Sequence, residues 1–442
     1  SITPKYRFNA NLTLSEHFSY NLVNTNEKYY IPVNGTPMYY VSSIGSYQNN
    51  EISSLASKQN SVMSDTRIDW HNRYDAHYLH VFGGARINWE SYTMNRLLGY
   101  NTGNDKTPKL ENTNPKFTEG VNENWNSLAW YAQAEYNYLS RYYLQANLTM
   151  EGSSLFGQDG GDLNFLDAAW GLFPGVQASL VISNEPWFNK SQSSHLFNYL
   201  RLTAGFEVSG NDNIDYYASR SYFRSKQFMN DPAALSFEGI GNTKIQWETT
   251  RRLNAGFEAS LLNDRLGLSV NFFRATTSNL LTRQTLGFLS GLSENWSNGG
   301  KLKNQGFDVT ATAKLLAIKD WQWQLGASVG HYKNELTELP DGDHVDTQVL
   351  GATIRSQVGH PVNVFYGYKT DGVFATSEEA AAAGLSIKAA NGSKDYFGAG
   401  DMRFVDLYND PANPGVINDD DRTIIGDPNP DIYGNIFTSL AW

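Results

Sequence analysis

The chain has 442 residues, a formal net charge of −11, 14% aromatic residues and no cysteine. The acidic balance, without any Lys/Arg cluster, argues against nucleic acid or an anionic membrane surface as a partner, and the absence of cysteine excludes disulfides and thiolate metal sites. No run of about 18 apolar residues occurs, which excludes a transmembrane helix, and the mean hydropathy of −0.47 is too low for one large aromatic core.

Apolar and polar residues alternate along most of the chain. In residues 253–261, for example, Leu253 and Phe257 alternate with Asn254 and Glu258. A period of two over about ten residues indicates a β-strand with one apolar and one polar face. In chain order, such strands are predicted over residues 8–14, 79–89, 128–138, 142–148, 176–182, 202–208, 253–261, 266–272, 307–315 and 321–329.

The predicted connections alternate between short and long. Short turns are expected at residues 140–141, 262–265 and 316–320. The long polar stretches cover residues 99–126, 151–173, 210–250 and 282–304. Short turns at one end and long loops at the other are typical of outer-membrane barrels, in which the turns are periplasmic and the loops extracellular.

Strand length separates a membrane barrel from a soluble β-sandwich. Strands in sandwiches average about five to six residues, whereas several runs here reach about nine to eleven, the length of a tilted membrane strand. Tyr and Trp gather at strand ends, where interfacial girdles lie; they are Tyr136, Tyr138, Tyr142, Tyr143, Trp321 and Trp323. The predicted fold class is therefore all-β, a transmembrane antiparallel β-barrel of which this chain supplies roughly twelve to fourteen strands.

The alternation also predicts which side chains meet lipid. The lipid-facing set is Leu253, Phe257, Phe307, Ala311, Leu325 and Val329, and the lumen-facing set is Glu258, Asp308, Lys314 and Gln324. One helix is expected in a loop, with Thr376 as N-cap, Glu379 completing a capping box and Gly384 ending it.

Local motifs do not indicate catalysis. The sequence Gly326-Ala-Ser-Val-Gly330 fits a nucleophile-elbow pattern, but it lies inside an alternating strand rather than on a strand–turn–helix bend. We therefore expect no enzyme, no catalytic residue and no cofactor. Catalysis by scattered loop residues is the alternative.

An Asp-rich segment lies near the C-terminal end of the chain. Asp406, Asp410 and Asp421 fall in a pattern similar to a calcium loop, but residues 411–414 interrupt its spacing. We therefore favour an ordered loop in which Arg403 or Arg422 pairs with one of the Asp residues over a metal site.

The same segment carries a family resemblance. Residues 398–406 (GAGDMRFVD) and 415–430 (GVINDDDRTIIGDPNP) resemble the signature of SusC/RagA-type TonB-dependent outer-membrane transporters. The matching positions are Gly400, Asp401, Arg403, Phe404, Asp406, Gly415, Asp421, Arg422, Gly426 and Pro430. Similar blocks occur in order at residues 136–148, 151–157, 170–174, 182–188, 202–214, 247–250, 299–307, 358–361 and 366–374.

The chain also departs from the family pattern. Met150-Glu151 stands where the family usually has Arg-Asp, and residues 411–414 are inserted in the Asp-rich segment. We expect residues 1–442 to form part of one transmembrane barrel domain of 22 strands, cut at both ends, with the N-terminal plug, the TonB box and the final strands outside this chain.

The resemblance implies a function. It implies TonB-dependent active import of a large nutrient, a glycan (oligosaccharide) or a peptide, across the outer membrane of a Bacteroidota-type bacterium. The implied partners are a SusD-like lipoprotein, the TonB–ExbB–ExbD complex and outer-membrane lipid. A barrel enzyme of lipase or protease type and a passive porin are the alternatives. The substrate-binding residues are not identified by the sequence.

Overall fold

A computed structural model describes residues 1–41, 45–161, 163–166, 168–190, 196–225, 235–287, 291–292, 294–389 and 391–442. The chain forms two compact units, and each is described by itself. Unit 1 comprises Ser1–Val181, Gly205–Thr249 and Leu281–Asn298; unit 2 comprises Ile182–Ala204, Thr250–Leu280 and Gly299–Trp442. The main sheet has 14 strands, which agrees with the predicted all-β fold and strand number.

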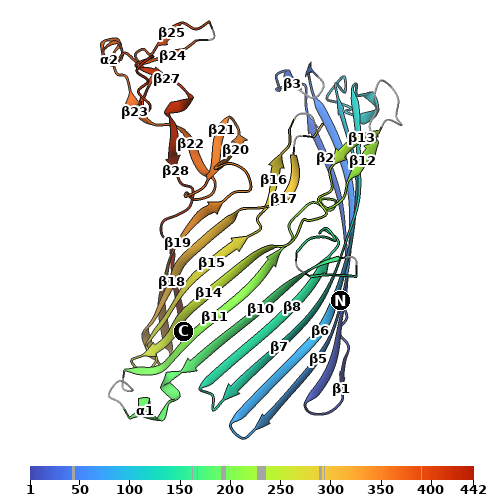
Figure 1. Ribbon diagram of the computed structural model, residues 1–442, viewed down its shortest axis with the longest axis vertical. Helices are drawn as coiled ribbons and strands as arrows, with labels where there is room; N and C mark the ends of the chain where they lie inside the picture. The colour runs from blue at the N-terminus through green and yellow to red at the C-terminus, as the bar shows by residue number, and fades with distance from the viewer. Residues whose placement is uncertain are drawn as a thin grey trace. The chain divides into compact units, whose positions relative to one another are not determined.

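Unit 1 is built on long antiparallel strands in the order β1-β2-β5-β6-β7-β8-β10 (Figure 1). Their bounds are β1 Lys5–Arg7, β2 Leu12–Ile31, β5 Glu51–Tyr74, β6 His77–Tyr100, β7 Lys116–Tyr138, β8 Tyr142–Ser153 and β10 Ala168–Val181, with β9 Leu163–Phe165 paired to β10. Short hairpins pair β3 (Tyr39–Val41) with β4 (Ser46–Gln48), β12 (Tyr222–Ser225) with β13 (Leu235–Gly239), and β16 (Leu281–Thr285) with β17 (Glu294–Asn298). A 3-10 turn, η2, covers Leu110–Asn112.

Unit 2 continues with antiparallel strands in the order β14-β15-β18-β19-β29. Their bounds are β14 Glu248–Leu261, β15 Leu266–Ser278, β18 Lys301–Ile318, β19 Trp321–Glu338 and β29 Tyr433–Ala441, while β11, Phe197–Asn211, contributes residues to both units. Between β10 and β11 lie η3 (Ile182–Asn184) and a short helix, α1 (Pro186–Asn189), that the sequence analysis did not predict.

The strands of unit 1 are longer than predicted. β5 and β6 each have 24 residues and β7 has 23, against the nine to eleven expected from alternation. The β6–β7 ladder runs as far as the pair Gly99 and Lys116, so the predicted loop 99–126 shortens to residues 101–115. The reason is that ladder hydrogen bonds satisfy the backbone whatever the side chains are, so pairing continues where the alternating pattern has ended.

The predicted first strand, residues 8–14, begins too early, because only residues 12–14 of this range belong to a strand. β1 ends at Arg7 and β2 begins at Leu12. Between them the Asn9 side-chain oxygen accepts the backbone N–H groups of Asn11 and Leu12, at 2.8 and 2.9 Å. This is an Asx-type turn, in which a side-chain oxygen replaces a backbone acceptor. Phe8 therefore lies in a turn although its apolar spacing fits the alternating pattern.

The predicted short turns are confirmed with one adjustment. Residues 139–141 connect β7 to β8, and residues 262–265 connect β14 to β15. β18 continues to Ile318, so the third turn is Lys319-Asp320 alone and not residues 316–320. At the turn between β7 and β8 the rings of Tyr138 and Tyr142 stack, with centroids 6.1 Å apart.

The register of unit 2 confirms which side chains share a face. Ala313 lies opposite Leu325, Val309 opposite Val329 and Phe307 opposite His331, while Lys314 lies opposite Gln324 on the other face. The alternation breaks at Leu315, because Lys314 pairs with Gln324 but Leu316 pairs with Trp323, which leaves Leu315 as an extra, bulged residue. The contact of the apolar face with lipid stays a prediction.

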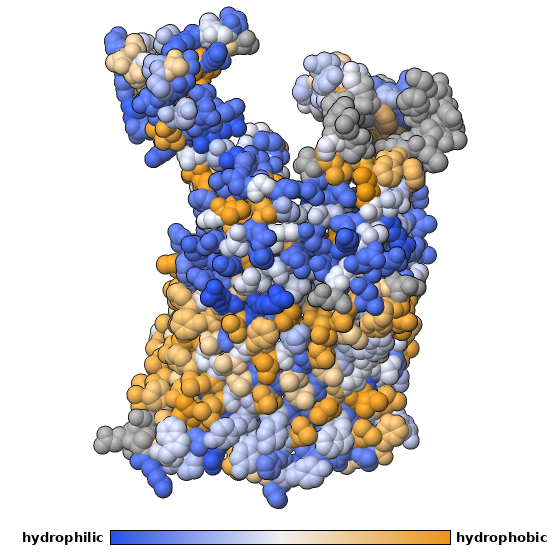
Figure 2. Space-filling view, viewed as in Figure 1, coloured by the Kyte–Doolittle hydropathy of each residue, from blue (hydrophilic) through white to orange (hydrophobic). Residues whose placement is uncertain are grey.

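Apolar side chains gather over the lower part of the strands, and hydrophilic side chains gather above them, in the view of Figure 2. On β8 and β10 the apolar face includes the exposed side chains of Leu144, Leu148, Leu172 and Val176. Exposed apolar side chains of this number are unusual for a surface that faces water. None of the helices in the described part of the chain has the length and apolar character needed to span a bilayer.

A long excursion of small elements separates β19 from β29. It contains a sheet of order β20-β21-β22-β28 and the groups β23-β26 and β25-β24-β27. The bounds are β20 His344–Val349, β21 Ala352–Gln357, β22 Val364–Tyr368, β23 Thr370–Val373, α2 Ser377–Ala383, β24 Ser386–Lys388, β25 Lys394–Tyr396, β26 Met402–Phe404, β27 Val416–Ile417, η6 Asp419–Asp421 and β28 Arg422–Gly426.

The predicted helix in this excursion is confirmed as α2. The Thr376 hydroxyl accepts the N–H of Glu379 at 3.2 Å, and Gly384 ends the helix at φ +65°. The Glu379 carboxylate reaches the N–H of Ala375, at 2.9 Å, rather than that of the N-cap residue. The Glu379 side chain therefore closes the box on the residue that precedes the N-cap, one position earlier than in the usual form.

Candidate binding cavity

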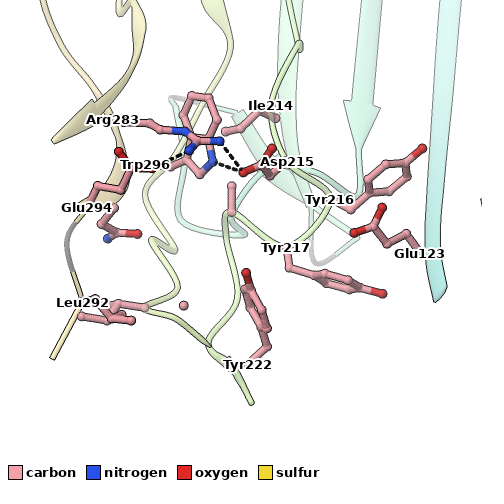
Figure 3. Close-up of a pocket in the computed structure, with 14 residues that line it drawn as sticks. Glu123, Ile214, Asp215, Tyr216, Tyr217, Tyr222, Arg283, Leu292, Glu294 and Trp296 are labelled. Carbon is pink, nitrogen blue, oxygen red and sulfur yellow. Dashed lines mark hydrogen bonds and ion pairs between the residues drawn. The ribbon is translucent and has the colours of Figure 1, made fainter. Parts of the chain in front are cut away.

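The loop segments of unit 1 enclose a cavity of about 560 Å³. Three segments and one strand build it: residues 214–218 after β11, the β12–β13 hairpin, the β16–β17 hairpin, and Glu123 of β7 (Figure 3). This volume lies within the range of small-molecule sites, about 300 to 1,000 Å³.

A hydrogen-bonded group forms one wall. In the β16–β17 ladder Arg283 lies directly opposite Trp296, so both side chains project from the same face. The guanidinium lies over the indole ring, 4.9 Å from its centroid. Trp296 Nε1 donates to Asp215 Oδ2 at 2.8 Å, Arg283 Nη2 donates to the same oxygen at 3.1 Å, and Arg283 Nη1 donates to Glu294 (Figure 3).

On the side of the cavity away from Arg283, two tyrosines hydrogen-bond to the long strands β6 and β7. The Tyr216 hydroxyl donates to Glu90 Oε1 of β6 at 2.7 Å, and the Tyr217 hydroxyl donates to the Asn122 carbonyl oxygen of β7 at 3.1 Å. Burial raises the pKa of Tyr216, and the hydrogen bond and negative charge of Glu90, with the charge of Glu123, raise it further. Tyr216 therefore remains a neutral hydrogen-bond donor at physiological pH.

An apolar cluster packs against the wall of the cavity. Its buried members are Phe156, Ala169, Phe173, Ala218, Ile245 and Trp247, and Ile214, Leu281 and Trp296 pack against them. Ile245 is fully buried, and the Trp247 ring lies 4.6 Å from that of Phe156. Because Ile214, Ala218 and Trp296 belong both to this cluster and to the cavity wall, close packing holds the wall in place.

The described residues that line the cavity include both charged and aromatic side chains. Among them, Glu123, Asp215 and Glu294 carry carboxylates and Arg283 carries a guanidinium. Tyr216, Tyr217, Tyr222 and Trp296 supply the aromatic rings. Such a lining is suited to binding by stacking, hydrogen bonding and charge.

A second polar group lies on the long strands of unit 1. Arg86 pairs with Asp65 at 2.8 Å, Tyr131 donates to the same carboxylate, and Arg67 pairs with Asp69 and stacks 3.6 Å from the Phe82 centroid. All of these side chains except Asp69 line a cavity of about 470 Å³. They lie on the face opposite Leu79, Val81 and Ile87 by the period of two, as the lumen of the predicted barrel requires.

All residues of the predicted family motif lie in the excursion of unit 2. Gly400 (φ +88°) and Gly415 (φ +72°) occupy turns that need a left-handed backbone, and a Cβ at Gly415 would lie 2.8 Å from the Gly384 carbonyl oxygen. Phe404 packs against Phe397 and Tyr368, with ring centroids 5.5 and 5.8 Å away.

The other motif residues also hold this excursion together. Asp401 accepts the Gly398 N–H at 2.8 Å, and Gly426 ends β28 opposite Phe365, four residues before Pro430. These are structural contacts, and none of the motif residues lines the cavity of unit 1.

The prediction for the Asp-rich segment is confirmed for one arginine. Arg422 lies 3.1 Å from Asp419, within salt-bridge distance. Arg403 instead pairs with Glu379 at 2.8 Å and with Asp371 at 3.4 Å. In the described part of the chain no group of three or more His, Cys, Asp or Glu side chains could hold a metal ion, and the absence of a metal site stays a prediction.

Backbone N–H groups, rather than arginines, hold most of these carboxylates. Asp406 accepts the N–H of Asn409 at 2.6 Å and of Gly415 at 3.2 Å, and Asp410 accepts that of Ala412 at 2.9 Å. Asp421 is 1% exposed and accepts three backbone N–H groups. Closely spaced N–H donors in turns therefore satisfy most of these carboxylates without a cation, beside the one arginine pair.

The sequence did not identify the cavity residues. Ile214 occurs in a block that the family resemblance had marked, but Arg283, Glu294 and Trp296 lie in a stretch that was expected to be only a polar loop. The structure reveals their relation through the register of a short hairpin, in which Arg283 lies opposite Trp296. The predicted loops 151–173, 210–250 and 282–304 lie partly outside the described residues.

Comparison with known proteins agrees with this architecture. Residues 2–421 match the family "TonB dependent receptor-like, beta-barrel", and the chain belongs to this family. It is therefore an outer-membrane β-barrel protein of the TonB-dependent receptor type.

Among curated relatives, the chain is 29% identical over 309 residues to TonB-dependent receptor P39 of Formosa agariphila, which is 69% of this chain and 28% of the relative. It is 25% identical over 260 residues to TonB-dependent receptor SusC of Bacteroides thetaiotaomicron, 55% of this chain and 25% of the relative. The chain thus spans about a quarter of each of these relatives.

Among solved structures, the RagAB peptide importer in its open-open state superposes over 100% of this chain and 44% of that chain, with a TM-score of 0.74 and 19% identity. At this identity the match shows the fold.

Proposed function

We propose that this chain forms part of the wall of a TonB-dependent importer that takes a large nutrient across the outer membrane. The observation that carries the proposal is the match of residues 2–421 to the receptor β-barrel family. The long amphipathic strands, which bear an apolar face and a charged face, support it. The polar face around Asp65 and Arg86 would line the water-filled side of the wall.

The substrate is a peptide or a glycan in this proposal. The RagAB protein, whose structure this chain resembles, is a peptide importer. The aromatic rings in the cavity of unit 1 offer faces on which a peptide side chain or a sugar ring could stack. Binding would occur at the loops that connect the long strands, on the extracellular side, and no bond of the substrate would be broken.

The proposed partners are a SusD-like surface lipoprotein and the TonB–ExbB–ExbD complex, the latter acting on parts of the protein outside this chain. Support comes from the SusC and RagAB relatives and from the loops opposite the short turns. Co-purification from native membranes in mild detergent checks the first partner. A full-length protein that emerges without any lipoprotein would contradict it.

Uptake measurements test active transport. The native strain, a TonB-null derivative and a strain lacking the full-length gene are supplied with labelled peptides and oligosaccharides. The proposal expects uptake to be lost in both mutants and restored when each gene is returned. Uptake at the normal rate without TonB would refute active transport and favour a porin. Hydrolysis of the nutrient by the purified protein would favour the enzyme alternative.

A further inference from the structure

We infer that one face of β15, β18 and β19 in unit 2 binds the anionic, phosphate-bearing head groups of membrane lipids. The binding side chains are Arg274, Lys303 and Lys333, which we call the cationic patch. The inference goes beyond the proposed import function, because it concerns how unit 2 contacts the bilayer. It rests on the predicted contact of the apolar face with lipid, which labels at Val329 and Gln324 test on their own.

The register of the strands places the cationic patch directly beside the apolar face. Phe272 of β15 lies opposite Phe307 of β18, and the two ring centroids are 6.2 Å apart. Arg274 follows Phe272 by two residues, so it projects from the same face. Lys303 precedes Phe307 by four residues, and the β18–β19 register brings Lys333 to this face as well. All three cations lie toward the strand ends that are away from the short turns.

This face of the three strands carries net positive charge, and the structure describes every residue of these strands. The two carboxylates on the face are Glu335 and Glu338. Glu338 pairs with Lys301, outside the patch. Glu335 lies opposite Lys303 in the register and 3.9 Å from the Lys333 ammonium, so it can balance only one of these two lysines. The guanidinium of the patch is exposed and makes no ion pair among the described residues.

A fourth cation, Arg251 of β14, lies on the same face. Its Nη1 donates to Ser278 Oγ at 3.5 Å, and Ser278 lies opposite Lys301 in the β15–β18 register. The cations therefore come from four different strands. The linear sequence has no Lys/Arg cluster, which is why the sequence alone argued against an anionic membrane surface as a partner. Strand pairing assembles the cluster that the linear sequence lacks.

The height of the patch above the aromatic rings identifies lipid as the occupant. Aromatic side chains lie at the boundary between the apolar band of a membrane strand and the head groups. Two residues along a strand tilted by about 40° rise about 5 Å, and the head-group layer on each side of a bilayer is about 5 to 8 Å thick. With Phe272 at the boundary, Arg274 lies within this layer, where its guanidinium can donate charge-assisted hydrogen bonds to phosphate oxygens.

Native mass spectrometry of the purified full-length protein in non-ionic detergent tests the inference. The protein is titrated with dioleoyl phosphatidic acid and with dioleoyl phosphatidylcholine, which share the same acyl chains but differ in net charge. Phosphatidic acid should bind at least about fivefold more tightly, the fold-change expected from one Lys or Arg near an anionic head group. Equal affinity for the two lipids would overturn the inference.

A third probe separates a lipid from a soluble phosphate ligand. Glycerol phosphate carries the same phosphate group without acyl chains. It should not displace phosphatidic acid at equal concentration, because the apolar face holds the acyl chains next to the patch. Displacement at equal concentration would assign the patch to a soluble anion and overturn its assignment to lipid.

Variants locate the effect. Arg274→Gln and Lys303→Gln should each weaken phosphatidic acid binding about fivefold and leave phosphatidylcholine binding unchanged. Arg274→Lys, which keeps the charge, should keep the preference. Lys388→Gln, which removes an exposed cation of β24 in the excursion, is the matched control and should have no effect.

The two patch variants lie on different strands, so a folding defect in one leaves the other informative. A preference for phosphatidic acid that survives in both would place the anionic lipid elsewhere on the protein and overturn the inference. An equal loss in Lys388→Gln would show that only the overall charge matters, and it would overturn the inference as well.

Discussion

Asp421 offers the sharpest test of how the excursion is stabilised. Its carboxylate is 1% exposed. Oδ1 accepts the N–H groups of Leu407 and Tyr408 at 2.8 and 3.0 Å, and Oδ2 accepts that of Asn418 at 2.8 Å. Replacing Asp421 with Asn keeps one oxygen but turns an N–H₂ donor toward one of these donors. One charge-assisted hydrogen bond is then lost and one buried donor is left unpaired.

The magnitude follows from these contacts. A hydrogen bond to a charged group contributes about 1.5 to 3 kcal/mol, and a buried donor left without a partner costs about 1 to 3 kcal/mol. We therefore expect Asp421→Asn to destabilise the local fold by about 3 kcal/mol, which corresponds to a roughly hundredfold larger open population. Asp421→Ala, which removes the acceptors of all three N–H groups, should cost more.

Hydrogen exchange of the full-length protein measures this effect locally. Peptides that contain residues 405–422 should lose protection by about two orders of magnitude in Asp421→Asn, while peptides from β5 and β6 stay unchanged. Asp420→Asn is the matched control, since the neighbouring Asp420 side chain is exposed. Equal exchange in both variants would refute the assignment of the loop's stability to the Asp421 carboxylate.

The same site has a defined pH dependence. Burial raises the pKa of Asp421, but the N–H groups of Tyr408, Asn418 and Leu407 outweigh burial and hold the pKa below its usual value. A carboxylate with a lowered folded pKa stabilises the fold fully above the unfolded pKa of about 3.9 and loses that contribution as the pH falls through the folded value. Protection of this loop should therefore be constant at neutral pH and fall only below about pH 4. A loss that begins near pH 6 would point to another group.

Three further predictions concern single positions. Gly415→Ala should destabilise the excursion by about 1 to 3 kcal/mol, because its φ is +72° and the new Cβ would meet a carbonyl oxygen, whereas Gly392→Ala, at φ +83° with open space, should cost less by the same exchange assay. Thr376→Ala should cost about 1 kcal/mol in α2, and Thr376→Ser should restore most of it, as seen in exchange of residues 377–383. Spin labels at Val329→Cys should be relaxed by a lipid-soluble quencher and those at Gln324→Cys by a water-soluble one; the reverse pattern would contradict the assigned faces.

The sequence by itself was sufficient to predict the apolar and polar faces of the long strands. Alternation with a period of two depends only on neighbouring residues in the chain, so the strand faces at Phe307, Val309 and Val329 could be predicted before their partners were known. The same holds for α2, whose cap, formers and terminal Gly384 lie within one short segment. The family motif was recognisable because it is contiguous in sequence.

Only the tertiary structure determined where the strands end and what the loops enclose. Strand ends depend on the partner strand: residues 116–126 are mostly polar, yet they pair with β6. The cavity joins Glu123, Asp215 and Arg283, which are far apart in sequence and meet only when the β16–β17 hairpin packs against the segment after β11. The contacts of the Asp-rich segment were likewise decided by the tertiary structure, because backbone N–H groups bind its carboxylates and turn geometry sets the direction of these N–H groups. No residue type in the sequence encodes that direction.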